Sequence, residues 1–276
     1  MSKINRYVTI MLSLALLTFS AAAPMSAQAK AASGELQAKK LAFAYADKTG
    51  KRLLAAGVTS PQRFTQAIHA PGMQKQAIFV KQQKATEKSN GRQNEWNFNQ
   101  DEGGLFKLAA GKILHNSSVL LAEKDAFQGH RFLKYQAVKD GKLEDDVIAA
   151  VEKAKKRKVV KQGLLGSAPS GVRIALVEFE RVKGEKPLAS LLLKTEQGLL
   201  FQDFVGTEDE YSTWRVDDGG EISAQDFRIL FVTASDAGYS LAYEWFGAEG
   251  SSLEVLQQQK TKFRSVLEGY RYTAPV

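Results

Sequence analysis

The second half of the chain alternates between apolar and polar positions. Residues 172–182 alternate in this way and are rich in β-branched and aromatic side chains, which predicts a β-strand. Polar and Gly-containing turns separate this segment from several similar ones. Neighbouring strands joined by such turns favour an antiparallel sheet. The further predicted strands are residues 188–194, 199–205, 211–216, 227–234 and 239–246.

A helix is predicted to close this half, over residues 253–270. Ser251 and Glu254 have the spacing of a capping box, and Gly269 suits the end of a helix. The apolar positions fall mostly on one helical stripe, as expected of a helix packed on a core. They are Leu253, Leu256, Phe263, Val266, Leu267 and Tyr270.

The first half resembles this ending. Residues 119–124 and 130–138 predict a hairpin, and residues 143–158 predict a helix. Val119 precedes Ile229 by 110 residues, and Leu143 precedes Leu253 by the same interval. The interval favours an internal duplication, although a hairpin followed by a helix is common enough to recur by chance.

Earlier segments of the first half are less regular. Residues 33–45 have helical character, and Ser60-Pro61 is a suitable helix start. Residues 78–84 and 96–99 predict further strands.

The predicted fold class is therefore α+β, a tandem of two units that each combine an antiparallel sheet with one helix. Residues 163–171 hold three Gly, one Pro and two Ser, which is typical of a linker. We expect a basic N-terminal domain over residues 30–162 and an acidic C-terminal domain over residues 172–276.

Residues 1–29 have the three-part layout of a secretory signal peptide. Lys3 and Arg6 precede a short apolar run, and Ala27-Gln28-Ala29 supplies the small residues of a cleavage site. We predict cleavage after Ala29 and an extracytoplasmic location, either periplasmic or secreted. The apolar run is interrupted and shorter than the roughly 20 residues of a membrane span. No later stretch reaches that length.

Composition and charge narrow the possible chemistry. The chain has no cysteine, which excludes disulfides, thiol catalysis and Cys-ligated zinc. Residues 30–163 carry 25 basic and 13 acidic side chains, a net charge of +12, whereas residues 164–276 carry 11 and 17, a net charge of −6. A basic half attracts anionic polymers or membrane surfaces. The simpler interpretation of this charge difference is that both halves have ordinary solvated surfaces that differ only in net charge.

One basic run is the candidate binding site. Six of the nine residues from 153 to 161 are basic: Lys153, Lys155, Lys156, Arg157, Lys158 and Lys161. At a helix end these charges complement the helix dipole. They also suit an anionic envelope polymer or membrane surface. Nucleic acid is disfavoured, because the run lacks aromatic residues for base stacking.

Catalytic and cofactor motifs are weak. His69, His115 and His130 form no metal-binding pattern, and no nucleophile-elbow or phosphate-loop pattern occurs. The acidic stretch at residues 208–210, with Asp217 and Asp218, reads as a solvated turn rather than a Ca²⁺ loop. We therefore predict neither cofactor nor metal.

The functional expectation is an exported, non-catalytic binding or scaffolding protein of the cell envelope. Its expected partners are an anionic polymer, a membrane surface or another envelope protein. The alternative is a hydrolase of envelope polymer whose Asp, Glu and His residues converge only in the folded chain.

Overall fold

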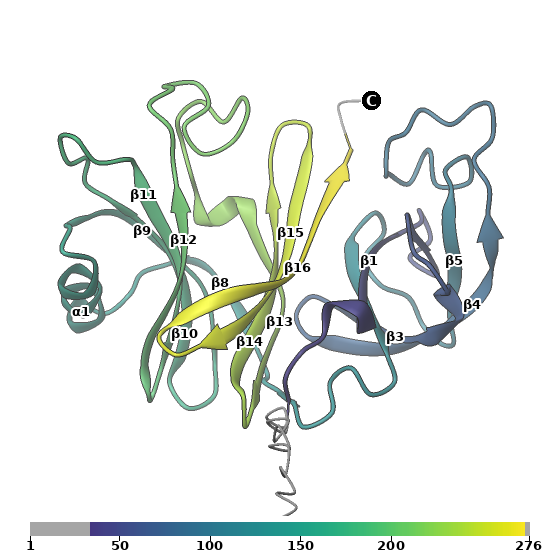
Figure 1. Ribbon diagram of the computed structural model, residues 1–276, viewed down its shortest axis with the longest axis horizontal. Coiled ribbons are helices and arrows are strands. Elements are labelled where there is room, and N and C mark those ends of the chain that lie inside the picture. Colours follow the sequence, from purple (N-terminus) through teal and green to yellow (C-terminus); the bar gives the residue numbers. More distant parts are fainter. Residues whose placement is uncertain (1–33, 274–276) are drawn as a thin grey trace, which may run out of the picture. The chain divides into compact units, whose positions relative to one another are not determined.

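The computed structural model describes residues 34–273, and strands dominate this part of the chain (Figure 1). Half of the structure is strand and 8% is helical. The strands form two sheets, a closed barrel of six strands and a curled sheet of ten strands.

The barrel contains the first six strands, in the order β1-β2-β5-β4-β3-β6, with β6 returning to pair with β1. All of its pairings are antiparallel. The strands are β1 (Leu41–Ala46), β2 (Arg52–Ala55), β3 (Phe64–His69), β4 (Met73–Gln83), β5 (Gly103–Leu108) and β6 (Ser118–Glu123).

Small side chains make this narrow barrel possible. Eight strands give an interior just wide enough to be filled by side chains, so six strands leave less room. The barrel core accordingly combines a few large residues, such as Phe106 and Leu121, with many alanines. These alanines are Ala42, Ala44, Ala46, Ala55, Ala67 and Ala77.

The curled sheet has the order β7-β13-β14-β15-β16-β12-β11-β10-β9-β8. All neighbours are antiparallel except β12 and β16, which meet in parallel at one pair, Phe201 and Lys262. Its strands are β7 (Arg131–Phe132), β8 (Gln136–Gly141), β9 (Val159–Ala168), β10 (Val172–Phe179), β11 (Leu188–Thr195), β12 (Gly198–Val205), β13 (Phe227–Ser235), β14 (Gly238–Phe246), β15 (Gly250–Gln259) and β16 (Lys262–Tyr272).

The two edge strands of this sheet are neighbours in the sequence. β7 and β8 are separated by residues 133–135 only, yet they stand at opposite ends of the strand order. Leu133 donates a backbone hydrogen bond to Val232 in β13, and the Tyr135 hydroxyl donates one to the Leu165 carbonyl in β9. The short link therefore joins the two edges of the curled sheet.

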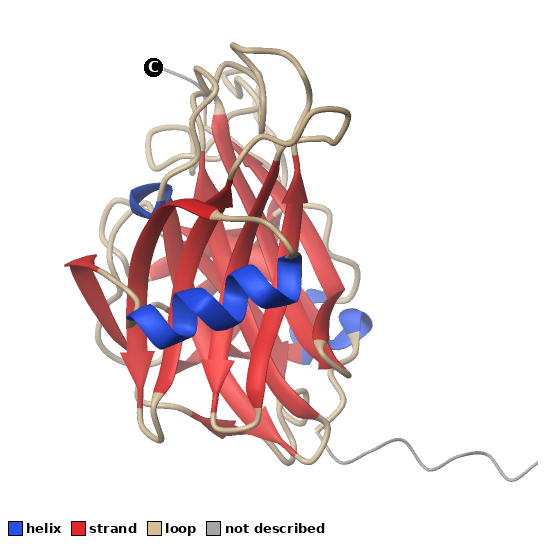
Figure 2. Cartoon of the chain, turned by 90° about the vertical axis from the view of Figure 1, so that its left-hand side faces the viewer, coloured by secondary structure: helices blue, strands red, loops and turns tan. Residues whose placement is uncertain are grey.

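One α-helix, α1 (Asp145–Lys155), lies across the strands of one face of the curled sheet (Figure 2). Its buried Val147 and Val151 pack with Val177 of β10 and Leu192 of β11. The opposite faces of β10 and β11 join the main core of the curled sheet. Burial on both faces explains why residues 174–177 of β10 and 191–193 of β11 are continuous apolar runs, in place of the alternation predicted for residues 172–182. The 3₁₀ turns are η1 (Ala38–Lys40), η2 (Pro61–Arg63) and η3 (Ala224–Asp226).

A shared core joins the barrel to the curled sheet. Leu41 and Leu120 of the barrel belong to the same buried cluster as Phe231, Leu253 and Val255 of the sheet. The packing is close where β1 meets β16. A Cβ atom on Gly269 would lie 2.6 Å from the Phe43 ring, so any larger residue here would force the ring or the strand to shift.

The predicted α+β tandem is wrong, because the described chain is mostly β and its two sheets differ in architecture. The predicted helix over residues 253–270 is instead the hairpin of β15 and β16. Residues 251–255 of β15 alternate between buried and half-buried positions, residues 255–257 are all buried, and in the turn that follows Lys260 adopts a positive φ of 57°. The apolar spacing fitted a helix, but pairing with β14 places this segment inside a sheet.

The predicted repeat in the first half also differs. Residues 118–123 form β6, which pairs with β1 and β3 of the barrel rather than with the segment that follows. Residues 41–45, the end of the segment expected to be helical, lie in β1. The helix predicted over residues 143–158 is confirmed as α1.

The predicted linker and signal peptide have different outcomes. Within residues 163–171, the stretch to Ala168 belongs to β9, and residues 169–171 turn into β10. The predicted signal peptide, residues 1–29, lies outside the described residues. In residues 34–273 no helix combines the length and the apolar character that a membrane crossing requires.

Candidate functional site

A large cavity lies where the curled sheet remains open, between β8 and β9 on one side and β13 on the other. Its volume is about 1170 Å³. The turn at Ala70 and Pro71, between β3 and β4 of the barrel, also contributes to its wall. We call it the seam cavity, because it follows the seam between the two edges of the sheet.

Strand edges form much of the wall of the seam cavity. Residues 161–165 of β9 and residues 227–229 of β13 line it consecutively. Because successive side chains of a strand point to opposite faces, a cavity that touches consecutive residues runs along the edge of the strand. The seam is therefore bordered by two strand edges that do not pair with each other.

Apolar side chains line the interior of the seam cavity. Leu176 of β10 and Ile229 of β13 belong to the main core of the curled sheet and also face the cavity. The other apolar lining residues are Tyr135, Ala137, Val138, Leu164, Leu165, Ile222, Ala224, Phe227 and Phe246. The cavity therefore extends from the surface into the apolar interior of the sheet.

Charged side chains are also part of the lining. The basic residues are Lys139, Lys142, Lys161 and Arg228, and the acidic residues are Asp140 and Glu178. Burial raises the pKa of Glu178 above its ordinary value, and Glu221 acts in the same direction, whereas the nearby Lys161 and Arg181 oppose the rise. Cationic side chains therefore outnumber acidic ones in this lining.

Arg228 and Glu244 form a pair beside the seam cavity. They stand opposite each other on β13 and β14, and Arg228 Nη1 lies 3.6 Å from Glu244 Oε2. Glu244 is fully buried, and its Oε1 accepts a hydrogen bond of 2.5 Å from the Ser118 hydroxyl of β6. The Arg228 guanidinium lies 4.8 Å from the centre of the Phe246 ring.

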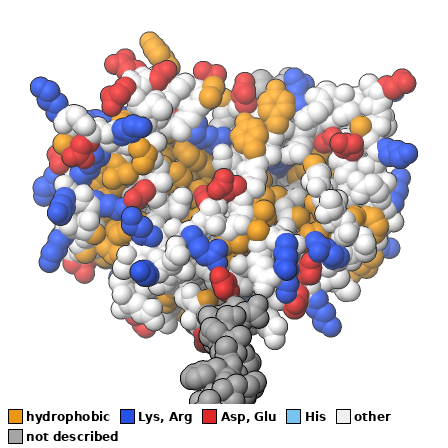
Figure 3. Space-filling view, viewed as in Figure 1, with side chains coloured by type: hydrophobic (Ala, Val, Ile, Leu, Met, Phe, Trp, Pro, Cys, Tyr) orange, Lys and Arg blue, Asp and Glu red, His pale blue; other side chains and the backbone are white. Residues whose placement is uncertain are grey.

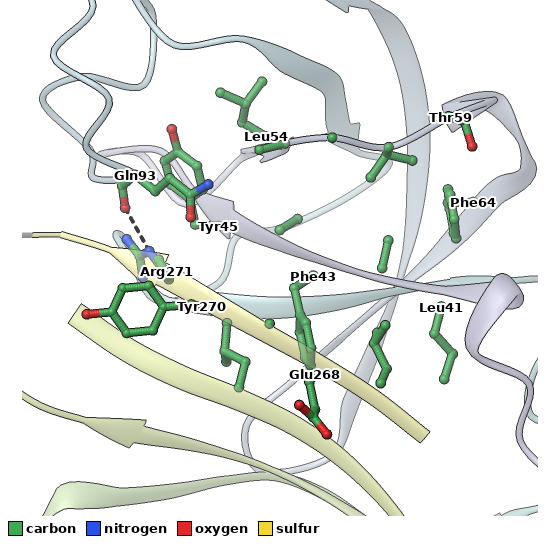
Figure 4. Close-up of a pocket in the computed structure, with 18 of the residues that line it drawn as sticks. Leu41, Phe43, Tyr45, Leu54, Thr59, Phe64, Gln93, Glu268, Tyr270 and Arg271 are labelled. Carbon is green, nitrogen blue, oxygen red and sulfur yellow. Dashed lines mark hydrogen bonds between the residues drawn. The ribbon is translucent and has the colours of Figure 1, made fainter. Parts of the chain in front are cut away.

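A second, smaller cavity of about 410 Å³ lies between the barrel and β16 (Figure 4). Residues 41–45 of β1 and 267–271 of β16 line it consecutively, so it too follows two strand edges. Over residues 41–44, β1 has no partner on its β2 side, since the two strands pair only at Tyr45 and Ala46. We call this cavity the β1–β16 cleft.

Arg271 closes one end of the β1–β16 cleft. Its Nε donates to the Gln93 carbonyl at 2.7 Å and its Nη1 to the Asn116 carbonyl at 2.7 Å, while Nη2 donates to Asn116 Oδ1. Burial lowers the pKa of Arg271 to about 10, against an opposing contribution from Glu244, so it remains charged at neutral pH. Its donors are thus used by the protein itself, and the residue holds the barrel to β16.

The predicted basic run is dispersed by the structure. Lys155 pairs with Asp203 and lies 4.3 Å from the centre of the Phe201 ring, while Arg157 is buried and pairs with Glu185. Lys158 donates to Glu152 at 2.8 Å. Lys153 and Lys156 are exposed at the end of α1.

Lys161 differs from the rest of the run because it lines the seam cavity. Its Nζ lies 3.8 Å from Glu221 Oε2, and its side chain is 47% exposed. Of the six predicted site residues, it alone lies at the larger cavity.

The histidines and the acidic stretch do not converge. His69 Nδ1 lies 2.9 Å from the Ala70 carbonyl, His130 lies beside Thr233, and His115 pairs with Glu95. Within residues 34–273 no group of three or more such side chains is placed to bind a metal ion.

The acidic residues instead stabilise their own loop. Asp218 accepts hydrogen bonds from the backbone N–H groups of Trp214, Arg215 and Gly220. Asp209 accepts from those of Tyr211 and Ser212.

Arg228 and Glu244 were missed by the sequence analysis. Each is the single charged residue of its strand, and the two strands were predicted as sequence neighbours in an antiparallel sheet. The opposite charges of Arg228 and Glu244, one on each of two neighbouring predicted strands, are the feature of the sequence from which this ion pair could have been inferred.

Part of the apolar surface lies open on the face shown in Figure 3. Hydrophobic side chains gather there over β11 and β12, with Lys and Arg toward the margin. Val205, at the end of β12, is 62% exposed.

No protein-family model, no curated protein and no solved structure matches this chain. The function is therefore inferred from the geometry of the described residues.

Proposed function

We propose that this protein is an exported, non-catalytic binding protein of the cell envelope that holds the apolar part of an amphipathic small molecule in the seam cavity. The supporting observation is the size and lining of that cavity, about 1170 Å³ bordered by core residues of the curled sheet. Small-molecule sites are typically concave, mostly apolar and on the order of 300–1,000 Å³. The seam cavity, at about 1170 Å³, is slightly larger than this range.

Apolar burial would supply most of the affinity. Each methylene group moved from water into an apolar site contributes about 0.8 kcal/mol, or about fourfold in affinity. A linear alkyl chain suits a cavity that follows two strand edges. Affinity should therefore rise with chain length until the cavity is filled.

Binding is favoured over the alternative of a hydrolase. A hydrolytic site brings titratable groups together around the reacting atoms. The carboxyl groups that line the seam cavity belong to Asp140, which is exposed, and Glu178, and no histidine lines it. The cationic and apolar lining supports holding a ligand rather than cleaving one.

Location and partners complete the proposal. The predicted signal peptide supports work outside the cytoplasm, close to membranes that are sources of amphipathic molecules. Contact with an anionic polymer or membrane surface would involve the exposed Lys153 and Lys156, since Lys155 and Arg157 pair within the protein. Co-sedimentation with anionic phosphatidylglycerol vesicles, with and without the double substitution Lys153→Gln and Lys156→Gln, tests this contact.

The binding function is tested by calorimetric titration of the purified protein with 1-hexanol, 1-octanol and 1-decanol. We expect affinity to increase along the series, by up to about fourfold per methylene. Absence of saturable binding across all three alcohols and the matching alkanoates would contradict the proposed function.

A matched pair of variants locates the binding site. Ala137 is exposed and lines the seam cavity, whereas Gln136 is its exposed neighbour on β8 and does not line it. Ala137→Trp should reduce 1-decanol affinity at least tenfold by filling the cavity, and Gln136→Trp should leave it unchanged. Equal effects of the two substitutions would place the bound alcohol elsewhere.

A further inference from the structure

Four cationic side chains at the seam cavity make no hydrogen bond to another described residue. They are Lys139, Lys142, Lys161 and Arg228, and none of them donates a hydrogen bond to the rest of residues 34–273. Arg215 and Arg271, by contrast, donate to backbone carbonyl groups. The donors at the cavity therefore remain available to a ligand.

Arg228 is the best placed of these four residues. Its side chain is 34% exposed, so it is partly removed from water, and it stands on the β13 edge that borders the cavity. Glu244 engages it only loosely, at 3.6 Å, and the buried Oε2 of Glu244 has no hydrogen-bond partner within the described chain. The pair thus fixes the position of the guanidinium without using its hydrogen-bonding capacity.

Free donors, rather than net charge, favour an anion here. Four acidic groups lie near the four cationic ones: Asp140 and Glu178 in the lining, Glu221 at 3.8 Å from Lys161, and Glu244 at 3.6 Å from Arg228. A guanidinium presents paired N–H donors that match the oxygen atoms of a carboxylate or phosphate. Partial burial strengthens such a contact relative to a fully solvated one.

We propose that the ligand of the seam cavity carries an anionic head group, a carboxylate or phosphate, that is bound by Arg228. Lys139, Lys142 and Lys161 supply the positive potential around it, while the alkyl chain extends into the apolar lining. This inference rests on the proposed function, because it assigns the head group of the same amphipathic ligand.

The test compares probes that share one alkyl chain. Decanoate and decyl phosphate carry the anion, 1-decanol lacks it, and acetate and inorganic phosphate lack the chain. We expect decanoate or decyl phosphate to bind at least tenfold more tightly than 1-decanol in 50 mM NaCl. This advantage should shrink in 0.5 M NaCl, since salt screens charges but leaves alkyl burial in place.

Variants assign the head-group contact to Arg228. Arg228→Gln alone would remove one of the two cationic side chains near the buried Glu244, the other being Arg271, so the double substitution Arg228→Gln and Glu244→Gln removes both charges of the pair and limits the loss of stability. It should reduce the preference for the anion over 1-decanol to within threefold. Lys161→Gln should reduce the preference in part, and Lys153→Gln, exposed on α1 away from the cavity, should not change it.

The outcomes separate the two proposals. Equal affinities for decanoate, decyl phosphate and 1-decanol would overturn the anionic head group but leave the binding function intact. An anion preference that survives the double substitution would overturn the assignment to Arg228. Binding of acetate or inorganic phosphate as tight as that of its decyl counterpart would overturn the amphipathic ligand itself.

Discussion

The Phe43 ring of β1 packs directly on Gly269 of β16, where a Cβ atom would come within 2.6 Å of it. We expect Gly269→Ala to destabilise the protein by about 1–3 kcal/mol, because the Phe43 ring or β16 must move to admit the added methyl group. Urea unfolding would measure the loss. The double variant Gly269→Ala with Phe43→Leu should recover part of it, and strictly additive effects would show that the two residues do not interact.

Arg271 should be essential to the attachment of the barrel to β16. Arg271→Met would leave the carbonyl groups of Gln93 and Asn116 without their donor and remove a buried charge. We expect a loss of about 3 kcal/mol or more in the free energy of unfolding. Arg271→Lys should recover less than half, since an ammonium group cannot reproduce the planar set of donors. Arg131→Met, at an exposed position, is the control, and an equal loss there would refute the assignment.

Asp47 should make stability depend on pH through the turn between β1 and β2. Burial by itself would raise the pKa of Asp47, but hydrogen bonds from Arg52, Thr49 and the backbone of Lys51 outweigh it and hold the pKa below its ordinary value. A depressed pKa means that the folded state favours the carboxylate. The resulting stabilisation is present above about pH 4, the pKa range of an unfolded aspartate, and is lost as the pH falls through the folded-state pKa.

Asp47→Asn should therefore cost about 1.5–3 kcal/mol at pH 7, and this cost should shrink as the pH is lowered below about 4. Thermal unfolding of both proteins between pH 2.5 and pH 7 measures the difference. A cost that stays constant across this range would show that the charge of Asp47 does not contribute.

Export predicts a defined N-terminus. If the signal peptide is cleaved after Ala29, the protein recovered from the extracytoplasmic fraction begins at Lys30. Edman sequencing of that protein checks the position, with the cytoplasmic precursor as the control. An intact Met1 on the exported protein would refute cleavage.

The sequence predicted local strands well where alternation and turns coincide. β10 to β14 were all expected from residues 172–246, and α1 from the apolar stripe that includes Val147 and Val151. Residues 211–216 were also expected to be a strand, but they belong to a loop built around Asp209 and Asp218. Side-chain hydrogen bonds to the backbone replaced the strand pairing there.

Long-range pairing explains what could not be predicted. Leu253, Leu256 and Phe263 have helical spacing, but β14 offers a complete pairing edge to residues 251–257, and tertiary pairing overrides local spacing. The seam cavity depends on β8 and β13, which are distant in the sequence. Lys161 was predicted as a site residue because its neighbours in the sequence are basic. Arg228 could be recognised only from its position beside the open seam.

The link at residues 133–135 sets a mechanical limit on the curled sheet. From Phe132 to Gln136 the chain can extend to about 14 Å, so the seam cannot widen beyond that span at this end. Arg228, Lys142 and Lys161 lie toward the opposite end of the seam, near η3. The chain itself thus limits the girth of the sheet at one end, whereas at the basic end the edges are held by the packing of Ala224 on Gly163 and by the Lys161–Glu221 pair, so a bulkier guest can widen the sheet there only by parting these non-covalent contacts.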